Sequence, residues 1–314
     1  MSSGTQTTTT QISGRTYLSI AVLTVLFVGV YFVLRSLPDA QCGFLHYEEI
    51  VNADGSVEFC ATNHAGFLDL TRLKYPVEMD VSHGQSVAVG SPIQVSMELA
   101  SAKGNPIFPY ELAVTHTKKM HVMVVDSSLT DYHHVHPEPD GLSGLYTFEF
   151  TPKRAGTYQI FAELVPLRTR RQIIATGEIA VSGEPTEMSF VRQTQSVVGG
   201  LRFDLGDVPE HLRTGADYRF DLEVTADTGE PIVLEEIMGA KGHMVAFDAA
   251  RKGFVHMHPV DSVVSSRAGL LVAQDSRQEL AFLFNVPNSG WYRFFAQVQV
   301  DGREVFGHFD LEVE

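Results

Sequence analysis

One long histidine pattern occurs twice in the chain, and this repeat constrains the fold more than any other feature. The first copy, HVMVVDSSLTDYHHVHP, spans 121–137, and the second, HMVAFDAARKGFVHMHP, spans 243–259. The histidines at 121, 134 and 136 recur 122 positions later, and His116 corresponds by the same offset to Met238. Both copies therefore read (His or Met)-x4-His-x12-His-x-His-Pro, although most other residues differ. The pattern predicts two copies of one domain and a requirement for imidazole at fixed positions.

Short β-forming runs, separated by Gly, Pro, Asn and Asp, begin at about Val77 and favour an antiparallel sandwich. The candidate strands follow the same order in both copies: 91–99, 121–126, 145–150, 156–164 and 173–181, then 217–224, 243–248, 280–286, 290–298 and 303–313. A Gly-x-Tyr sequence, ending at Tyr158 and Tyr292, resembles the tyrosine corner of immunoglobulin-like sandwiches. We predict an all-β body of two tandem immunoglobulin-like antiparallel β-sandwiches, over 77–185 and 186–314.

The N-terminal part predicts attachment to a membrane. Residues 1–16 are polar and predict a disordered tail. The following run, TYLSIAVLTVLFVGVYFVL, has no charged residue and is long enough to cross a hydrocarbon core of about 30 Å. A cleaved signal peptide is the alternative, but the run exceeds the usual core of about 7–15 residues and no small-x-small site follows it. We therefore predict an uncleaved transmembrane anchor over 17–35, with the bulk of the chain exported.

A connector over 36–76 contains both cysteines, Cys42 and Cys60, each followed four positions later by a histidine. In an oxidising compartment, this pair predicts a disulfide between Cys42 and Cys60. A Cys2His2 metal site and free or lipid-modified thiols are the alternatives. The stretch GFLDLTRLKY, 66–75, is compatible with a short amphipathic helix.

The His-x-His pairs predict metal binding. In an extended strand, residues two apart point to the same side, and the proline after each pair favours that conformation. A histidine at the start of a neighbouring strand can complete a group of three imidazoles. The predicted ligands are His116, His121, His134 and His136 in the first domain, and Met238, His243, His256 and His258 in the second.

Copper is the predicted metal, with zinc as the alternative. The exchange of His116 for Met238 replaces an imidazole by a soft thioether, which suits copper and above all Cu(I). Met120, Met123 and Met257 are predicted to pack in the core, and His133 to face away from its neighbours. The structural alternative is that the histidines hydrogen-bond to the backbone and fix a loop.

Other functions find little support. The net charge of −15 argues against a nucleic-acid partner, since a phosphate-binding surface is basic. The sequence has no nucleophile elbow, P-loop, dinucleotide fingerprint or C-x-x-C-H haem motif.

The stretches KKMHVMVVDSSLTDYHHVHP with FEFTPKRAGTYQIFAE, and AKGHMVAFDAARKGFVHMHP with FLFNVPNSGWYRFFAQ, resemble those of bacterial exported YtkA-like and copper-resistance protein C-like β-sandwiches. The resemblance covers both predicted sandwiches and implies an immunoglobulin-like fold and metal handling in the periplasm. The copper-resistance type takes ligands from its mature N-terminus, and those positions have no counterpart here. A weaker resemblance is to two-copper monooxygenases of the peptidylglycine type, whose His-x-His plus Met site matches His256, His258 and Met238. Those enzymes are richer in disulfides.

We therefore expect a protein anchored in the bacterial inner membrane with its bulk in the periplasm. It would bind copper, as a chaperone or sequestration module, with one His/Met site per domain. Its partners would be the membrane and a metal donor or membrane-complex protein. The alternatives are a non-catalytic scaffold or accessory subunit of a membrane complex, and a two-copper monooxygenase.

Overall fold

In the computed structural model, the described residues are 13–36, 47–51, 57–61, 67–71, 75–84, 87–141, 143–230, 232–260 and 278–314. The chain divides into two compact units, Met1–Gly43 and Phe44–Glu314. In the first unit, α1 (Gly14–Ser36) forms where the anchor was predicted. Among the described residues, it is the only helix long and apolar enough to cross a membrane, and a helix of this kind near the N-terminus is a membrane anchor or a signal sequence. The predicted tail before residue 13 lies outside the described residues.

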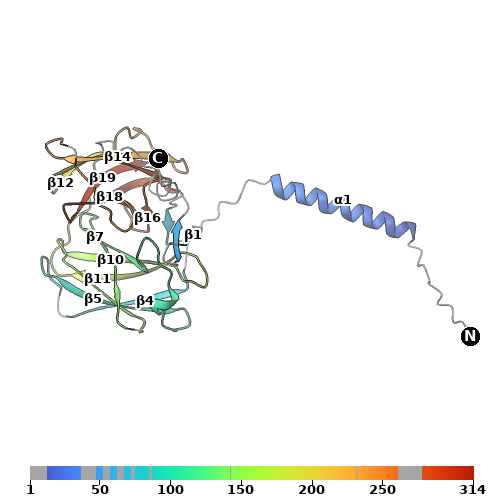
Figure 1. The fold of residues 1–314 in the computed structure, drawn as a ribbon, viewed down its shortest axis with the longest axis horizontal. Helices are drawn as coiled ribbons and strands as arrows, with labels where there is room; N and C mark the ends of the chain where they lie inside the picture. Colours follow the sequence, from blue (N-terminus) through green and yellow to red (C-terminus); the bar gives the residue numbers. More distant parts are fainter. Residues whose placement is uncertain are drawn as a thin grey trace, which may run out of the picture. The chain divides into compact units, whose positions relative to one another are not determined.

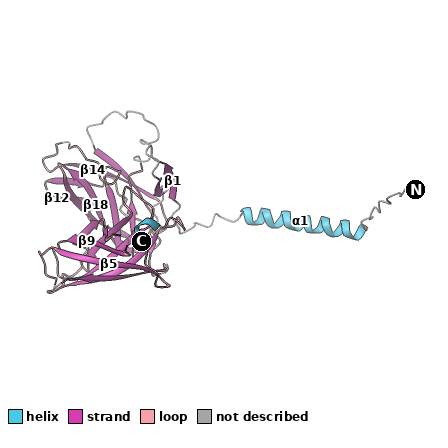
Figure 2. Ribbon diagram, turned by 60° about the horizontal axis from the view of Figure 1, so that its bottom comes forward, coloured by secondary structure: helices cyan, strands magenta, loops and turns pink. Residues whose placement is uncertain are grey.

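In the described part of the second unit, the named strands pair antiparallel, and the single helical element is a short 3-10 turn, η1 (Pro109–Glu111), as Figure 2 shows. The first sandwich has one sheet in the order β11-β10-β6-β7 and another in the order β4-β5-β9-β8. The bounds are β4 (Val77–His83), β5 (Ile93–Ser101), β6 (Met120–Asp126), β7 (Tyr132–Val135), β8 (Glu138–Pro139), β9 (Leu145–Phe150), β10 (Gly156–Leu164) and β11 (Ile173–Val181). Its core lies between these sheets and includes Val95, Tyr146 and Ile160.

The second sandwich repeats this plan. Its sheets have the orders β19-β18-β15-β16-β3 and β12-β13-β14-β17. The bounds are β3 (Leu68–Asp69), β12 (Gln195–Val198), β13 (Leu201–Asp204), β14 (Tyr218–Ala226), β15 (His243–Asp248), β16 (Gly253–Met257), β17 (Gln278–Phe284), β18 (Gly290–Val300) and β19 (Arg303–Val313). The prediction of all-β, immunoglobulin-like antiparallel sandwiches after one N-terminal apolar helix is confirmed. The boundary at 185 and 186 stays a prediction.

Both repeats also form the tyrosine corner that Gly-x-Tyr indicated. Gly156 and Gly290 have φ values of 112° and 128°, which favour glycine because it has no side chain. The Tyr158 hydroxyl accepts a hydrogen bond from Arg154 N (3.0 Å), and the Tyr292 hydroxyl donates one to Asn288 O (2.8 Å). Each bond reaches the backbone four residues upstream, as in a tyrosine corner.

The two sandwiches pack face to face through the sheets that contain β6 and β15. Figure 1 shows the sheets as successive layers, from β5 through β10 to β18 and β14. In β6, Val122 and Val124 face the core of their own sandwich, whereas Met123 and Val125 face the other sandwich. A separate apolar cluster fills the interface, with Phe161, Phe247 and other side chains from both repeats. Because both faces are covered, every residue of β6 is buried.

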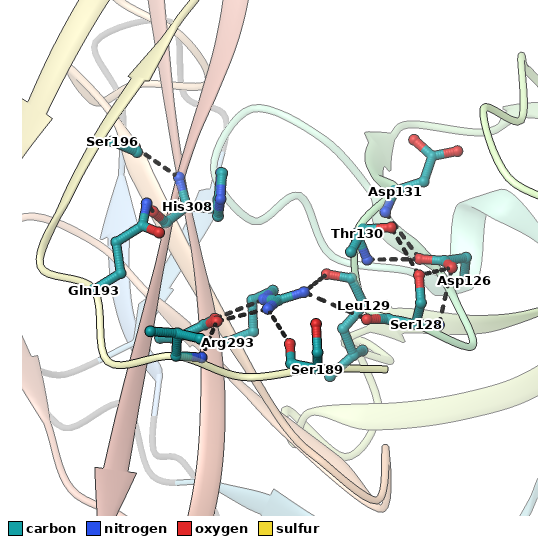
Figure 3. A network of polar contacts seen from close by, with 12 residues as sticks. Asp126, Ser128, Leu129, Thr130, Asp131, Ser189, Gln193, Ser196, Arg293 and His308 are labelled. Carbon is teal, nitrogen blue, oxygen red and sulfur yellow. Dashed lines mark hydrogen bonds and ion pairs between the residues drawn. The ribbon is translucent and has the colours of Figure 1, made fainter. Parts of the chain in front are cut away.

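Arg293, on β18, adds polar contacts to one end of this interface (Figure 3). Its guanidinium pairs with Asp310 through two hydrogen bonds of 2.6 Å. It also donates to the carbonyls of Leu129 (3.2 Å) and Ser128 (3.4 Å), which belong to the β6–β7 loop of the other sandwich. The carboxylate of Asp126 accepts hydrogen bonds from backbone amides of that loop, such as Thr130 N (2.8 Å). The loop is therefore held with its carbonyls available to Arg293.

The connector differs from expectation in one place. The helix suggested over 66–75 is wrong, because β3 (Leu68–Asp69) is extended and pairs with Phe254 and Gly253 of β16. Leu68 is buried in the interface cluster, so packing of its side chain overrides the weak helical pattern. The strand β1 (Tyr47–Val51) pairs with β2 (Val57–Ala61), which contains Cys60, but Cys42 lies outside the described residues. The disulfide stays a prediction.

Candidate metal centre

In each repeat, three histidines lie together on the sheet that packs against the other sandwich. They are on the side of that sheet that faces the other sandwich. His121 is on β6, His134 is on the neighbouring strand β7, and His136 follows directly after β7. His243 on β15, His256 on β16 and His258 after it repeat the arrangement. Within each group, one ligand atom per histidine lies within 4.8 Å of the others. Each group can therefore hold a metal ion. We call them the first group (His121, His134, His136) and the second group (His243, His256, His258).

Hydrogen bonds fix the tautomers in the first group. His121 Nε2 lies 2.9 Å from the carbonyl oxygen of Thr115 and must donate to it, because a carbonyl only accepts. His134 Nδ1 donates in the same way to Gln297 Oε1 (2.9 Å). The remaining nitrogens, His121 Nδ1 and His134 Nε2, are 3.2 Å apart, and in the neutral rings both carry lone pairs. Two lone pairs cannot hydrogen-bond to each other, but they are placed to bind one cation between them.

The second group shows the same arrangement. His243 Nε2 donates to the carbonyl of Ile237 (2.9 Å), and His256 Nδ1 donates to the carboxylate of Glu163 (3.2 Å). The opposite nitrogens, His243 Nδ1 and His256 Nε2, are buried and have no hydrogen-bond partner among the described residues. Buried polar atoms are normally paired, so these two nitrogens point to a ligand.

A proton is a poor candidate for that ligand. Burial lowers the pKa of His121 to about 4, where the nearby Glu163 opposes the shift and His256 adds to it. Burial, with the neighbouring His121, lowers the pKa of His136 to about 3, and burial with His256 does the same for His243. Burial and His256 place the pKa of His134 well below its ordinary value. At neutral pH these rings are uncharged, which is the form that binds metals.

Glu163 and Gln297 each orient a histidine of the opposite repeat, across the interface between the sandwiches. Glu163 on β10 belongs to the first repeat, but it accepts its hydrogen bond from His256 of the second. Gln297 occupies the equivalent place on β18 and accepts from His134 of the first repeat. The Gln297 amide donates in turn to Glu304 (3.0 Å), which fixes its orientation. Residues that hold the far nitrogen of a ligating imidazole set its tautomer and raise its basicity.

His116 and Met238 lie in equivalent tight turns, closed by backbone pairing of Thr115 with Lys118 and of Ile237 with Ala240. Both have positive φ, 49° and 51°, which is uncommon for a residue with a side chain. His116 does not join the first group. Its ring instead stacks on His258, with 3.6 Å between centroids, and lies 6.0 Å from His121. The roles of His116 and Met238 as ligands stay predictions.

Other expected side chains lie away from the two groups. The His133 ring packs against Phe150, with centroids 5.1 Å apart, and its Nε2 is 3.1 Å from Asp131, so it faces away as predicted. The methionines at 120, 123 and 257 are buried in apolar clusters, as predicted. Sequence reasoning missed Glu163 and Gln297. Their signal was present, because the aligned stretches FEFTPKRAGTYQIFAE and FLFNVPNSGWYRFFAQ end on these two residues.

Similar solved structures are distant. A protein from Corynebacterium diphtheriae described as membrane anchored has 10% identity and a TM-score of 0.23, over 76% of this chain and 59% of that one. Fibronectin(III)-like modules of CbhA from Clostridium thermocellum have 11% identity and a TM-score of 0.20, over 75% and 94%. Among curated proteins, no relative matches. A family model described as a domain of unknown function, DUF8832, matches residues 74–181 and again 196–314, so the chain belongs to that family and contains two copies of its domain.

Proposed function

We propose that this is a membrane-anchored, extracytoplasmic copper-binding protein that stores or transfers the metal, with one ion per histidine group. The observation that carries the proposal is the set of buried imidazole nitrogens whose lone pairs face one another, His121 Nδ1 with His134 Nε2, and unpartnered His243 Nδ1 and His256 Nε2. Imidazole ligands suit copper, zinc, iron and nickel.

Two features favour copper and exchange. A thioether at Met238 takes the place that His116 has in the other repeat, and thioethers favour Cu(I) over zinc. His136, His258 and Met238 are only partly buried, so the two groups are not sealed on every side. A site that is partly open can release its ion to a partner, as a chaperone or sequestration protein needs to do. Uptake and release require no acid, base or nucleophile.

The proposed membrane attachment rests on α1, a helix that is long and apolar enough to span a membrane. The resemblance to exported YtkA-like and copper-resistance protein C-like sandwiches supports the periplasmic side of the bacterial inner membrane. The same placement would give access to a metal donor in that compartment.

Elemental analysis of the full-length protein from its native membrane, followed by competition titration with Cu(I), Cu(II) and Zn(II), tests the function. We expect tight copper uptake and a copper-dependent rise in the thermal midpoint. The double variant His134→Ala/His256→Ala should lose both effects. If the native protein takes up no metal, and copper leaves its midpoint unchanged, the protein is instead a scaffold or accessory subunit.

A further inference from the structure

The two histidine groups are close neighbours. The ring of His256 lies 5.3 Å from that of His134 and 5.8 Å from that of His121, between centroids. A metal bound at about 2 Å from a ring nitrogen is about 3 Å from the ring centroid, so ions held by His134 and His256 would lie within about 11 Å of each other. The His116 ring, stacked on His258 and 6.0 Å from His121, lies between the groups.

A buried carboxylate accompanies this pair of groups. Glu163 is 7% exposed and stands opposite His121 in the β6–β10 pairing, while its side chain accepts the hydrogen bond from His256. A carboxylate at this position would offset part of the repulsion between two nearby cations.

The two groups nevertheless differ in charge. The second group is oriented by the carboxylate of Glu163, through His256. The first group is oriented by the neutral amide of Gln297, which accepts a hydrogen bond from His134. The carboxylate of Glu304 contacts Gln297 and not the histidine itself. A carboxylate on the far nitrogen makes an imidazole a stronger donor to a divalent cation than an amide does.

We propose that the two histidine groups form one dinuclear centre shared between the sandwiches, and that Glu163 makes the second group bind its ion first. This inference rests on the proposed function and adds to it the number, proximity and order of the bound ions. The centre requires both repeats, because each group's orienting residue comes from the opposite sandwich.

Electron paramagnetic resonance during a Cu(II) titration of the full-length protein tests the dinuclear centre. The first equivalent should give the signal of an isolated ion. The second should broaden that signal, because spins within about 11 Å interact magnetically. Two additive, unbroadened signals would show separate sites, and saturation at one ion would show a mononuclear site. Either result overturns this inference but leaves copper binding intact. A complete lack of uptake would instead overturn the proposed function.

The order of filling has its own test, with matched variants of equivalent residues. Glu163→Gln keeps the shape of the side chain and should weaken the first ion's affinity by about ten- to hundredfold, because loss of an orienting carboxylate has effects of that size. Gln297→Glu should strengthen the second ion instead. His258→Ala should remove the tighter ion, whereas His136→Ala should leave it in place. An unchanged ratio of the two dissociation constants in Glu163→Gln, or loss of the tighter ion in His136→Ala, would contradict the proposed order.

Discussion

The difference between His133 and His136 is decided by which side of a strand each occupies. His136 brings Nε2 to 3.3 Å from His121 Nδ1, whereas His133 turns to Phe150 and Asp131. His136→Gln should therefore lower the affinity of the first group for its ion by at least about tenfold, and the matched variant His133→Gln should leave that affinity unchanged. Competition with a chromogenic chelator measures both affinities. Equal losses in the two variants would mean that the group of three is not the binding site.

Acid should destabilise the metal-free protein by protonating buried histidines such as His121. The pKa of His121 is about 4 in the fold and near its ordinary value of 6.5 in the unfolded chain. Between these values the unfolded chain binds more protons, so the free energy of unfolding falls as pH drops from 6.5 towards about 4. The loss is on the order of 3 kcal/mol for His121 alone. Above pH 6.5 this contribution is fully present.

Urea unfolding of the metal-free protein between about pH 7 and about pH 5 measures this loss. His121→Gln has no ionisable group at this position, so its stability should vary less steeply with pH than that of the native protein. Carboxylates titrate in both proteins, and the comparison removes their contribution. Parallel pH profiles for the two proteins would show that His121 is not held neutral by the fold.

At the scale of strands and loops, the Arg293 contacts join β18 and β19 to the β6–β7 loop of the other sandwich. Arg293→Ala should cost about 3–5 kcal/mol of unfolding free energy, because it leaves the buried carboxylate of Asp310 without its partner. The matched control is Arg219→Ala, whose pair with Asp221 is about half exposed and should contribute less than about 1 kcal/mol. Denaturant unfolding of both variants, at constant pH and salt, compares them. Equal costs would show that burial does not set the contribution of these pairs.

Strands of the two sandwiches were predictable because their local patterns are strong. The run GTYQIFAEL, predicted over 156–164, coincides with β10, and LYTFEF over 145–150 coincides with β9. The grouping of His121 with His134 and His136 followed from adjacent strands and the alternation of side chains. The error over 66–75 arose because a short amphipathic pattern does not reveal a distant strand edge, here that of β16.

Packing between the sandwiches was not predictable from the same patterns. In MHVMVVD of β6, apolar residues occupy both faces, which indicates burial on both sides but not what covers the second side. The 122-residue offset matched histidine with histidine in the two repeats, so it predicted one site in each domain and left open whether the sites lie close together. The hydrogen bonds of Glu163 with His256 and of Gln297 with His134 join opposite repeats, and no spacing within one repeat encodes them.

For the molecule as a whole, the interface makes the two sandwiches depend on each other. Each has its own apolar core, and a third apolar cluster lies between them beside the histidines. Phe161 belongs to this third cluster, where its ring lies 5.3 Å from Phe254 and 5.7 Å from Phe247 of the other repeat. Residues 44–314 should therefore unfold in one cooperative transition, and metal should raise the temperature of that whole transition.

Phe161→Asp tests this dependence. The substitution places a carboxylate without a partner in the apolar interface, which is strongly unfavourable, but it leaves the two inner cores unchanged. We expect scanning calorimetry to show two separate transitions in this variant and metal affinity to fall, because the interface no longer holds Glu163 against His256. Val197→Asp, at an exposed position, should keep a single transition and native affinity. A single native-like transition with unchanged metal binding in Phe161→Asp would mean that each sandwich folds and binds its ion alone.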